Sequence, residues 1–204
     1  IGFRAPSLFE LYSPYGNPDL EAEESEGWDA GIDQELFDGV LMIGLTYFEM
    51  DFDNRIDFDF AISAYNQLFG KTRTNGIESA IDFLPADFLA FHLSYTYTDT
   101  EGPDGDQLAR RPMHKMYFNT TYSYSDKGSL SLDVNWVGDR DEIPTAPVNT
   151  LESYTVVNLA ADYDISDHVN IYGRIDNLFD EYYEEAWSYA TAGLSAYAGV
   201  KFSF

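Results

Sequence analysis

The chain has 204 residues, enough for one domain or a large part of one. It contains no cysteine, which excludes a disulfide framework and any thiolate metal site. Acidic residues outnumber basic ones 36 to 11, and the formal net charge of −25 repels nucleic acid and excludes nucleic-acid-binding proteins as a class. Aromatic residues make up 17% of the chain, which excludes a highly charged disordered protein.

The hydropathy of the chain indicates whether a helix could cross a membrane, and its first residues indicate whether it is a complete protein. The sequence contains no run of 18 apolar residues, so no transmembrane helix is expected. The first residues, Ile1-Gly2-Phe3-Arg4, include neither an initiator methionine nor the apolar region of a signal peptide. We therefore expect the chain to be a piece of a longer protein.

Apolar and polar residues alternate with a period of two along most of the chain, which predicts strands rather than helices. The last segment shows this best, because every second residue from Leu194 to Phe204 is apolar and the residues between them are mostly polar or small. Nine segments follow the pattern: 25–37, 40–50, 74–84, 88–100, 112–125, 128–140, 152–163, 168–178 and 193–204.

The connections between these segments alternate strictly between short and long. The short ones have the Asp, Gly or Pro composition of tight hairpins and lie at Asp38-Gly39, Pro85–Asp87, Asp126-Lys127 and Asp164–Asp167. The long ones are 51–73, 101–111, 141–151 and 179–191. Short periplasmic turns and long extracellular loops are typical of transmembrane barrels. The predicted fold is thus an all-β, antiparallel transmembrane β-barrel, with 1–24 as an extracellular loop segment and 25–204 as barrel strands.

Five tyrosines stand near strand ends on the apolar face, where a barrel has its aromatic girdles. They are Tyr95, Tyr97, Tyr122, Tyr124 and Tyr163. The alternative is a soluble, acidic β-sandwich that acts as a binding or adhesion module and packs these rings in its core. The strict alternation of short and long connections puts the short ones at one end of the strands and the long ones at the other, which favours the barrel over the sandwich. A self-contained bacterial barrel has an even number of strands and leaves no open edge in lipid, so nine strands do not close one by themselves. Either upstream strands belong to the same barrel, which we favour, or several chains close a barrel together.

Four stretches resemble TonB-dependent outer-membrane receptors. The first runs from Phe3-Arg4-Ala5-Pro6 through Glu10-Leu11-Tyr12, Asn17-Pro18-Asp19-Leu20 and Glu23-Glu24-Ser25. The others are Asn75-Gly76-Ile77-Glu78, Arg110-Arg111-Pro112-Met113-His114, and Asn177-Leu178-Phe179-Asp180-Glu181-Tyr182-Tyr183 with Tyr189, Ala192, Gly193 and Phe204. The vitamin B12 (cobalamin) receptor branch is most similar, especially over 177–193. The chain departs from the family at Glu21-Ala22-Glu23, where Lys-Pro-Glu is frequent, and at Gly193-Leu194, where Gly-Arg is common.

The resemblance implies a barrel of about 22 strands with an N-terminal plug domain, of which this chain holds the last nine strands. It implies a location in the outer membrane of a Gram-negative bacterium, in contact with its lipid, and active import of a scarce bulky nutrient such as cobalamin or a ferric siderophore. Energy would come from the TonB complex, which engages the plug. Phe204, with Phe202 before it, resembles the signal read by the barrel-assembly machinery.

Ligand contacts are expected from the long outer loops, because rigid scaffolds concentrate function on their loops. The aromatic and polar candidates are Tyr12, Tyr15, Tyr65, Asn66, Arg110, Trp187 and Tyr189. Aromatic side chains of this kind could stack on a corrin or a siderophore.

No catalytic residue, cofactor or metal site is expected. The three histidines, His92, His114 and His168, lack metal-ligand spacing, and no motif singles out a nucleophile. Acidic residues recur on every polar strand face, which indicates a solvated wall rather than a pair of glycosidase carboxylates. The acidic segment 99–106 does not have the spacing of an EF-hand and is interpreted as a flexible loop.

Overall fold

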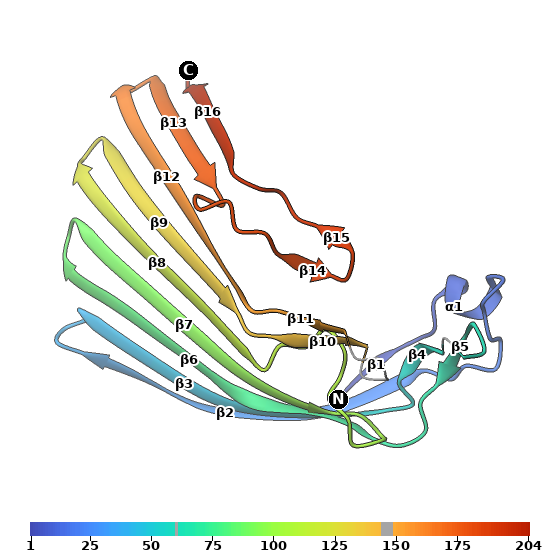
Figure 1. The fold of residues 1–204 in the computed structure, drawn as a ribbon. Helices are drawn as coiled ribbons and strands as arrows, with labels where there is room; N and C mark the ends of the chain where they lie inside the picture. Colours follow the sequence, from blue (N-terminus) through green and yellow to red (C-terminus); the bar gives the residue numbers. More distant parts are fainter. Residues whose placement is uncertain (60, 144–148) are drawn as a thin grey trace. The chain divides into compact units, whose positions relative to one another are not determined.

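The computed structural model describes residues 1–59, 61–143 and 149–204 (Figure 1). A ten-stranded sheet with the order β1-β2-β3-β6-β7-β8-β9-β12-β13-β16 dominates it, which confirms the all-β prediction. Nine of these strands match the nine predicted segments. They are β2 (Glu23–Leu36), β3 (Leu41–Asp53), β6 (Thr72–Ala86), β7 (Leu89–Glu101), β8 (His114–Ser125), β9 (Gly128–Val137), β12 (Tyr154–Ser166), β13 (Val169–Asp176) and β16 (Ser195–Phe202).

Smaller elements occupy the segments that were predicted as loops. Strand β1 (Gly2–Arg4) pairs with the start of β2, and helix α1 (Leu8–Tyr12) follows it. Three two-stranded hairpins lie in the long connections: β4 (Ile56–Asp59) with β5 (Ala64–Gln67), β10 (Arg140–Ile143) with β11 (Asn149–Leu151), and β14 (Glu184–Ala186) with β15 (Tyr189–Ala190). Alternation over two to four residues is too short to be recognised in a sequence. No helix of the described residues is long and apolar enough to cross a membrane.

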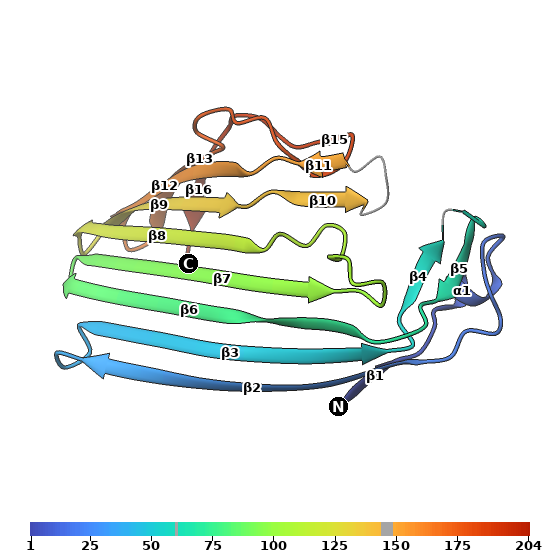
Figure 2. The ribbon, with the colours of Figure 1, turned by 60° about the horizontal axis from the view of Figure 1, so that its bottom comes forward.

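The chain forms two compact units, and their boundary crosses the long strands β2, β3, β6 and β7. The first comprises Ile1–Ala30, Tyr47–Gly76 and Thr98–Leu108; the second comprises Gly31–Thr46, Ile77–Tyr97 and Ala109–Phe204. Within the second unit, Figures 1 and 2 show the turns β8–β9 and β12–β13 at one end of the strands and hairpin β10–β11 at the other. The predicted sorting of connections by length is confirmed there.

The strand registers place apolar residues of neighbouring strands in rows on one face of the second unit. Leu132 of β9 lies opposite Leu159 of β12, which in turn lies opposite Ile175 of β13. On the far side of β13, Ile171 pairs with Val200 of β16. This face is solvent-accessible, since Ile171 is 40% exposed and Val200 53%.

A sandwich would bury such a face against a second sheet. Among the described residues the buried apolar side chains are instead Leu20, Ile56, Leu151 and Val156, and none of them belongs to these rows. The sandwich alternative is therefore wrong. An apolar face of this extent, left uncovered by the described residues, requires an apolar solvent, and lipid is one.

Aromatic rings gather at both ends of the apolar face, as girdles at two membrane interfaces would. Near the short turns, Tyr124 stacks on Tyr163 at 6.0 Å. At the loop end, His114 contacts Tyr95, Tyr97 and Trp136, with ring centroids 6.0, 5.3 and 6.5 Å apart. Four of the five predicted girdle tyrosines are thus in ring clusters, and the fifth, Tyr122, packs edge-on against Phe88.

The opposite face of the second unit is polar and internally hydrogen-bonded. Asp133 accepts hydrogen bonds from Tyr117 Oη at 2.5 Å and Asn119 Nδ2 at 2.9 Å. His92 Nδ1 lies 2.6 Å from Asp82 Oδ1, which makes a second link on this face. Acidic residues that the sequence placed on a solvated wall therefore lie among polar partners, opposite the apolar rows.

Candidate functional site

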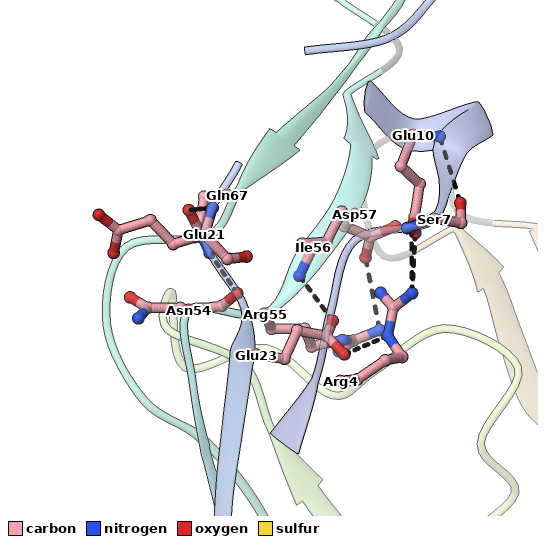
Figure 3. Close-up of polar contacts among 10 residues, drawn as sticks. All are labelled: Arg4, Ser7, Glu10, Glu21, Glu23, Asn54, Arg55, Ile56, Asp57 and Gln67. Atoms are coloured by element: carbon pink, nitrogen blue, oxygen red, sulfur yellow. Dashed lines mark hydrogen bonds and ion pairs between the residues drawn. The ribbon is translucent and has the colours of Figure 1, made fainter. Parts of the chain in front are cut away.

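The first candidate site is in the first unit, where one guanidinium joins two carboxylates (Figure 3). Arg4 of β1 donates from Nε to Glu23 Oε2 at 2.5 Å, and from Nη1 to both Glu10 carboxylate oxygens at 3.1 Å. The Arg4 side chain is 48% exposed, whereas those of Glu10 and Glu23 are 13% and 15% exposed. The two acids are therefore held against the protein, and the arginine covers them.

Glu10 also closes a capping box at the start of α1. Ser7 Oγ accepts the Glu10 N–H at 3.2 Å, and Glu10 Oε2 accepts the Ser7 N–H at 2.6 Å. A serine three residues before a glutamate makes this reciprocal pair, which satisfies two free N–H groups of a helix start. The cap lets a helix of five residues form, because so short a helix is unstable on its own.

Glu23, the first residue of β2, and Glu21 just before it hold the hairpin β4–β5. Glu23 Oε1 accepts the backbone N–H of Ile56 at 2.7 Å. Gln67 Nε2 donates to the Asn54 carbonyl at 2.7 Å and to the Glu21 carbonyl at 3.2 Å, while its Oε1 accepts the Glu21 N–H (Figure 3). Both strands of the hairpin are thus fixed by polar contacts to distant parts of the sequence.

The charge states of this network follow from its geometry. Burial disfavours ionisation of Glu23, but hydrogen bonds from Arg4 and from the Ile56 N–H outweigh it and hold the pKa of this carboxyl below its usual range. Burial likewise opposes ionisation of Glu10, and hydrogen bonds from Ser7 and Arg4 lower the pKa of its carboxyl. The hydrogen bond to Glu23 raises the pKa of Arg4 further above its ordinary value. All three groups are charged at neutral pH.

An aromatic cluster, defined by Phe9, Tyr15, Phe58 and Tyr65, lies between α1 and the hairpin. Tyr65 has its ring centroid 6.0 Å from Phe9 and 5.2 Å from Phe58, and Tyr15 is 6.0 Å from Phe58, all edge-on. The Tyr65 N–H also donates to the Tyr15 carbonyl at 2.8 Å. The structure therefore brings two predicted ligand residues, Tyr15 and Tyr65, together.

Two further predicted residues lie near this cluster in the sequence. Tyr12 ends α1 and is 70% exposed. Asn66 follows Tyr65 in β5, and its Oδ1 accepts the Gln67 N–H at 2.9 Å. The sequence interpretation missed Phe9 and Phe58, although both are aromatic and stand in segments that it assigned to outer loops.

The second candidate site is a groove of about 400 Å³ in the second unit. Trp187, a predicted ligand residue, lines it together with Tyr154, Tyr183 and the acidic residues Glu152 and Glu181. Tyr154 and Tyr183 stack with centroids 4.3 Å apart. The Arg140 guanidinium lies 5.6 Å from the centre of the Tyr154 ring and donates to the Glu184 carbonyl, so it ties β10 to β14 beside the groove.

The remaining predicted ligand residues differ in their surroundings. Tyr189 of β15 is paired with Ala186 and is 75% exposed. The Arg110 guanidinium forms an ion pair with Glu142, which is 5% exposed. The backbone N–H of Arg110 donates to the Asp141 carbonyl at 2.7 Å. Arg110 thus holds hairpin β10–β11 to the loop between β7 and β8.

Asn177 organises the closing hairpin of the chain. It is 3% exposed and has a positive φ of 52°. Its side chain donates to the carbonyls of Glu181 and Ala192 and accepts the Glu181 N–H at 2.8 Å. From the sequence, Asn177 was only the first residue of a family motif, and no structural role was assigned to it. These hydrogen bonds show that it closes the loop after β13.

The terminal residues of the assembly-signal prediction are exposed. Phe202 of β16 pairs with Val169 and is 63% exposed, and Phe204 follows the strand. Among the described residues, no group of three or more His, Asp or Glu side chains is placed to hold a metal ion.

One exposed apolar face, an opposed polar face and connections sorted by length define the wall of a transmembrane-type β-barrel with candidate contacts on its outer loops. The family model described as "TonB dependent receptor-like, beta-barrel" matches residues 2–178. The chain therefore belongs to the TonB-dependent receptor family, as its motifs predicted.

Relatives and solved structures agree with this assignment. The vitamin B12 transporter BtuB of Vibrio cholerae is 28% identical over 99% of this chain and 33% of its own length. The ferric enterobactin receptor PfeA of Pseudomonas aeruginosa matches with a TM-score of 0.79 and 22% identity, over 99% of this chain and 37% of that one. The copper transporter OprC matches with a TM-score of 0.85 and 19% identity, over 99% of this chain and 35% of that one. The chain thus spans about a third of the length of the curated relatives it matches.

Proposed function

We propose that this chain is the C-terminal barrel wall of an outer-membrane receptor that imports a scarce, bulky nutrient with energy from TonB. Cobalamin and ferric siderophores are the nutrient classes proposed. Membership of the receptor family supports this, together with the similarity to a vitamin B12 transporter over 99% of the chain. On this proposal the TonB complex reaches the receptor through a plug domain outside the chain.

The observation that carries the proposal is the division of the sheet into two faces. Leu159, Ile171 and Val200 lie in rows that suit lipid, and Asp133 and Tyr117 belong to a hydrogen-bonded wall that suits a hydrated interior. A barrel is the β-structure that can present both faces in a membrane, because closure leaves no backbone group unpaired in lipid.

The outer loops are proposed to take hold of the nutrient. The aromatic cluster offers Tyr15 and Tyr65, with Tyr12 and Asn66 beside them in the sequence. The groove offers Trp187, and Tyr189 stands exposed on β15 of the same hairpin. Aromatic faces bind large planar or apolar ligands by stacking. Arg110 is proposed to order the loop rather than to reach the ligand, because Glu142 already engages its guanidinium.

The test is uptake by the full-length protein in a host that lacks its own cobalamin receptor. Labelled cyanocobalamin is supplied to cells with and without TonB, and ferric siderophores are supplied in parallel. We expect TonB-dependent accumulation of one of these classes. Uptake that is unchanged when TonB is removed, or a protein that fractionates away from the outer membrane, would overturn the proposal.

Phe204 and Phe202 are proposed to act in assembly. Deleting Phe204 is expected to lower the amount of receptor in the outer membrane, whereas Lys201→Ala in the same strand serves as the control. Equal amounts of the two variants would refute an assembly role.

A further inference from the structure

In Figure 3 the Arg4 side chain contacts the carboxylates of both Glu10 and Glu23. Arg4 and these two carboxylates form the polar support of α1 and the β4–β5 hairpin. Arg4 Nη1 binds Glu10, which lies in α1 directly after Phe9. Its Nε binds Glu23, whose other oxygen accepts the N–H of Ile56, the first residue of β4. The guanidinium therefore connects α1 with the hairpin through two carboxylates.

The aromatic cluster is divided between the same two elements. Phe9 comes from α1 and Tyr15 from the segment after it, whereas Phe58 and Tyr65 face each other across β4 and β5. A backbone hydrogen bond from the Tyr65 N–H to the Tyr15 carbonyl joins the two sides directly. Edge-on ring contacts at 5.2 to 6.0 Å depend closely on how the elements are placed.

We propose that Arg4 is a positioning residue that fixes α1 against the β4–β5 hairpin and so sets the arrangement of the four rings offered to the ligand. The positioning follows from the contacts described; the ligand step rests on the proposed function. Arg4 itself is not placed against the ligand and acts through Glu10 and Glu23.

Arginine suits this role because its planar fork holds several donors at fixed angles. Nε and Nη1 point to different carboxylates at the same time. A lysine has one ammonium on a flexible stem and does not reproduce this geometry. Lysine at this position is therefore expected to keep part of the connection, and alanine none of it.

Arg73 provides a matched control in the same unit. It also binds two carboxylates, Asp51 at 2.9 Å and Glu49 at 3.8 Å, and half of its side chain is exposed. Its partners lie on β3, outside both α1 and the hairpin. Loss of Arg73 removes a similar amount of surface charge pairing without touching the proposed support.

The experiment is hydrogen–deuterium exchange of the full-length receptor in detergent, with Arg4→Ala, Arg4→Lys, Glu10→Gln and Arg73→Ala compared with the natural protein. Backbone N–H groups of Ile56 and Tyr65 report on the hairpin and its link to Tyr15. Strands β12 and β13, far along the chain, report on the barrel. Heat-modifiable migration on gels establishes that each variant is folded.

For Arg4→Ala we expect exchange at Ile56 and Tyr65 to rise by about tenfold or more, with β12 and β13 unchanged. Arg4→Lys should give a smaller rise, and Arg73→Ala none at either amide. Glu10→Gln should affect Tyr65 more than Ile56, because it releases α1 and leaves Glu23 in place.

Unchanged exchange in a folded Arg4→Ala variant, or an equal rise in Arg73→Ala, would overturn the positioning role. These readouts need no ligand, so they stand or fall independently of the proposed transport. Binding of cyanocobalamin, measured on the same variants, tests the ligand step: weaker binding in Arg4→Ala with partial rescue in Arg4→Lys supports it. Tight binding unaffected by Arg4→Ala would refute that step alone.

Discussion

Replacing Leu132 by arginine tests whether the apolar face of the sheet is in lipid. Leu132 lies in the middle of β9, opposite Thr120 of β8 on one side and Leu159 of β12 on the other. Its neighbours on the same strand, Ser131 and Asp133, point to the polar face. An arginine at position 132 would therefore enter the apolar rows with no acidic partner directly across either strand pair.

The size of the effect follows from the depth of this position. A barrel presents to lipid an apolar band of about 25 Å, and arginine near its middle costs about 2–4 kcal/mol. That range corresponds to a change of about 30- to 700-fold in the folding equilibrium, since about 1.4 kcal/mol is a factor of ten. The cost would be much smaller in a soluble protein whose exposed residue faced water.

Ser131→Arg is the matched control, one residue away on the other face. Ser131 Oγ lies 3.3 Å from Thr121 Oγ among polar side chains, so an arginine there can reach water and costs less than about 1 kcal/mol. The free energy of unfolding is measured on the full-length protein folded into lipid vesicles, by denaturant titration followed by gel migration. A cost at Ser131 equal to or larger than that at Leu132 would refute the assignment of the two faces.

Three further predictions concern the loops and the strand contacts. Asn177→Ala should lower the free energy of unfolding by about 2 to 3 kcal/mol in denaturant titration, and Asn177→Gly should lower it by a similar amount. The reason is that the buried hydrogen bonds of the Asn177 side chain contribute more to stability than its positive φ costs, so a neutral glycine variant would contradict this. Lowering the pH from 7 to below about 4 should reduce the protection factor of the Ile56 N–H, which is the intrinsic exchange rate of a free amide at the same pH divided by the observed rate. The lowered carboxyl pKa of Glu23 gives stability that is complete above its unfolded value of about 4.3 and lost as pH falls through the folded one; a protection factor that does not change with pH would contradict this. Gly199→Ala should cost about 1 kcal/mol because a Cβ there clashes with the Tyr172 ring, and Tyr172→Ala should relieve the cost in the double variant, which a double-mutant cycle measures.

Alternation in the sequence was sufficient to predict the nine long strands and the sorting of their connections. Each strand needs only its own residues to show a period of two, so the pattern is local and can be recognised without knowledge of neighbours. Leu132, for example, is two residues from both Leu130 and Val134, so the three apolar side chains lie on the same face of the strand. Tight turns such as that around Asp38 and Gly39 are likewise local, because left-handed backbone favours Gly, Asn and Asp.

The candidate site could be predicted in part. Tyr15, Tyr65 and Trp187 were singled out as aromatic residues in outer loops, and the structure places them in a ring cluster and along a groove. Phe58 was missed although Tyr65 was singled out, because the pairing of β4 with β5 that sets the two rings opposite each other is not visible in the sequence. The engagement of Arg110 by Glu142 was also unseen, since nothing in the local sequence relates residues 32 positions apart.

By itself the sequence determined which residues face lipid and which face water, because that choice is made within each strand. Only the tertiary structure decided that Arg4 binds both Glu10 and Glu23, and that this pair of contacts supports rings from α1 and from β4–β5. The physical reason is that ion pairs and ring contacts act over a few ångströms in space. Which residues come that close depends on how the chain folds back, and no repeating pattern along the chain records it.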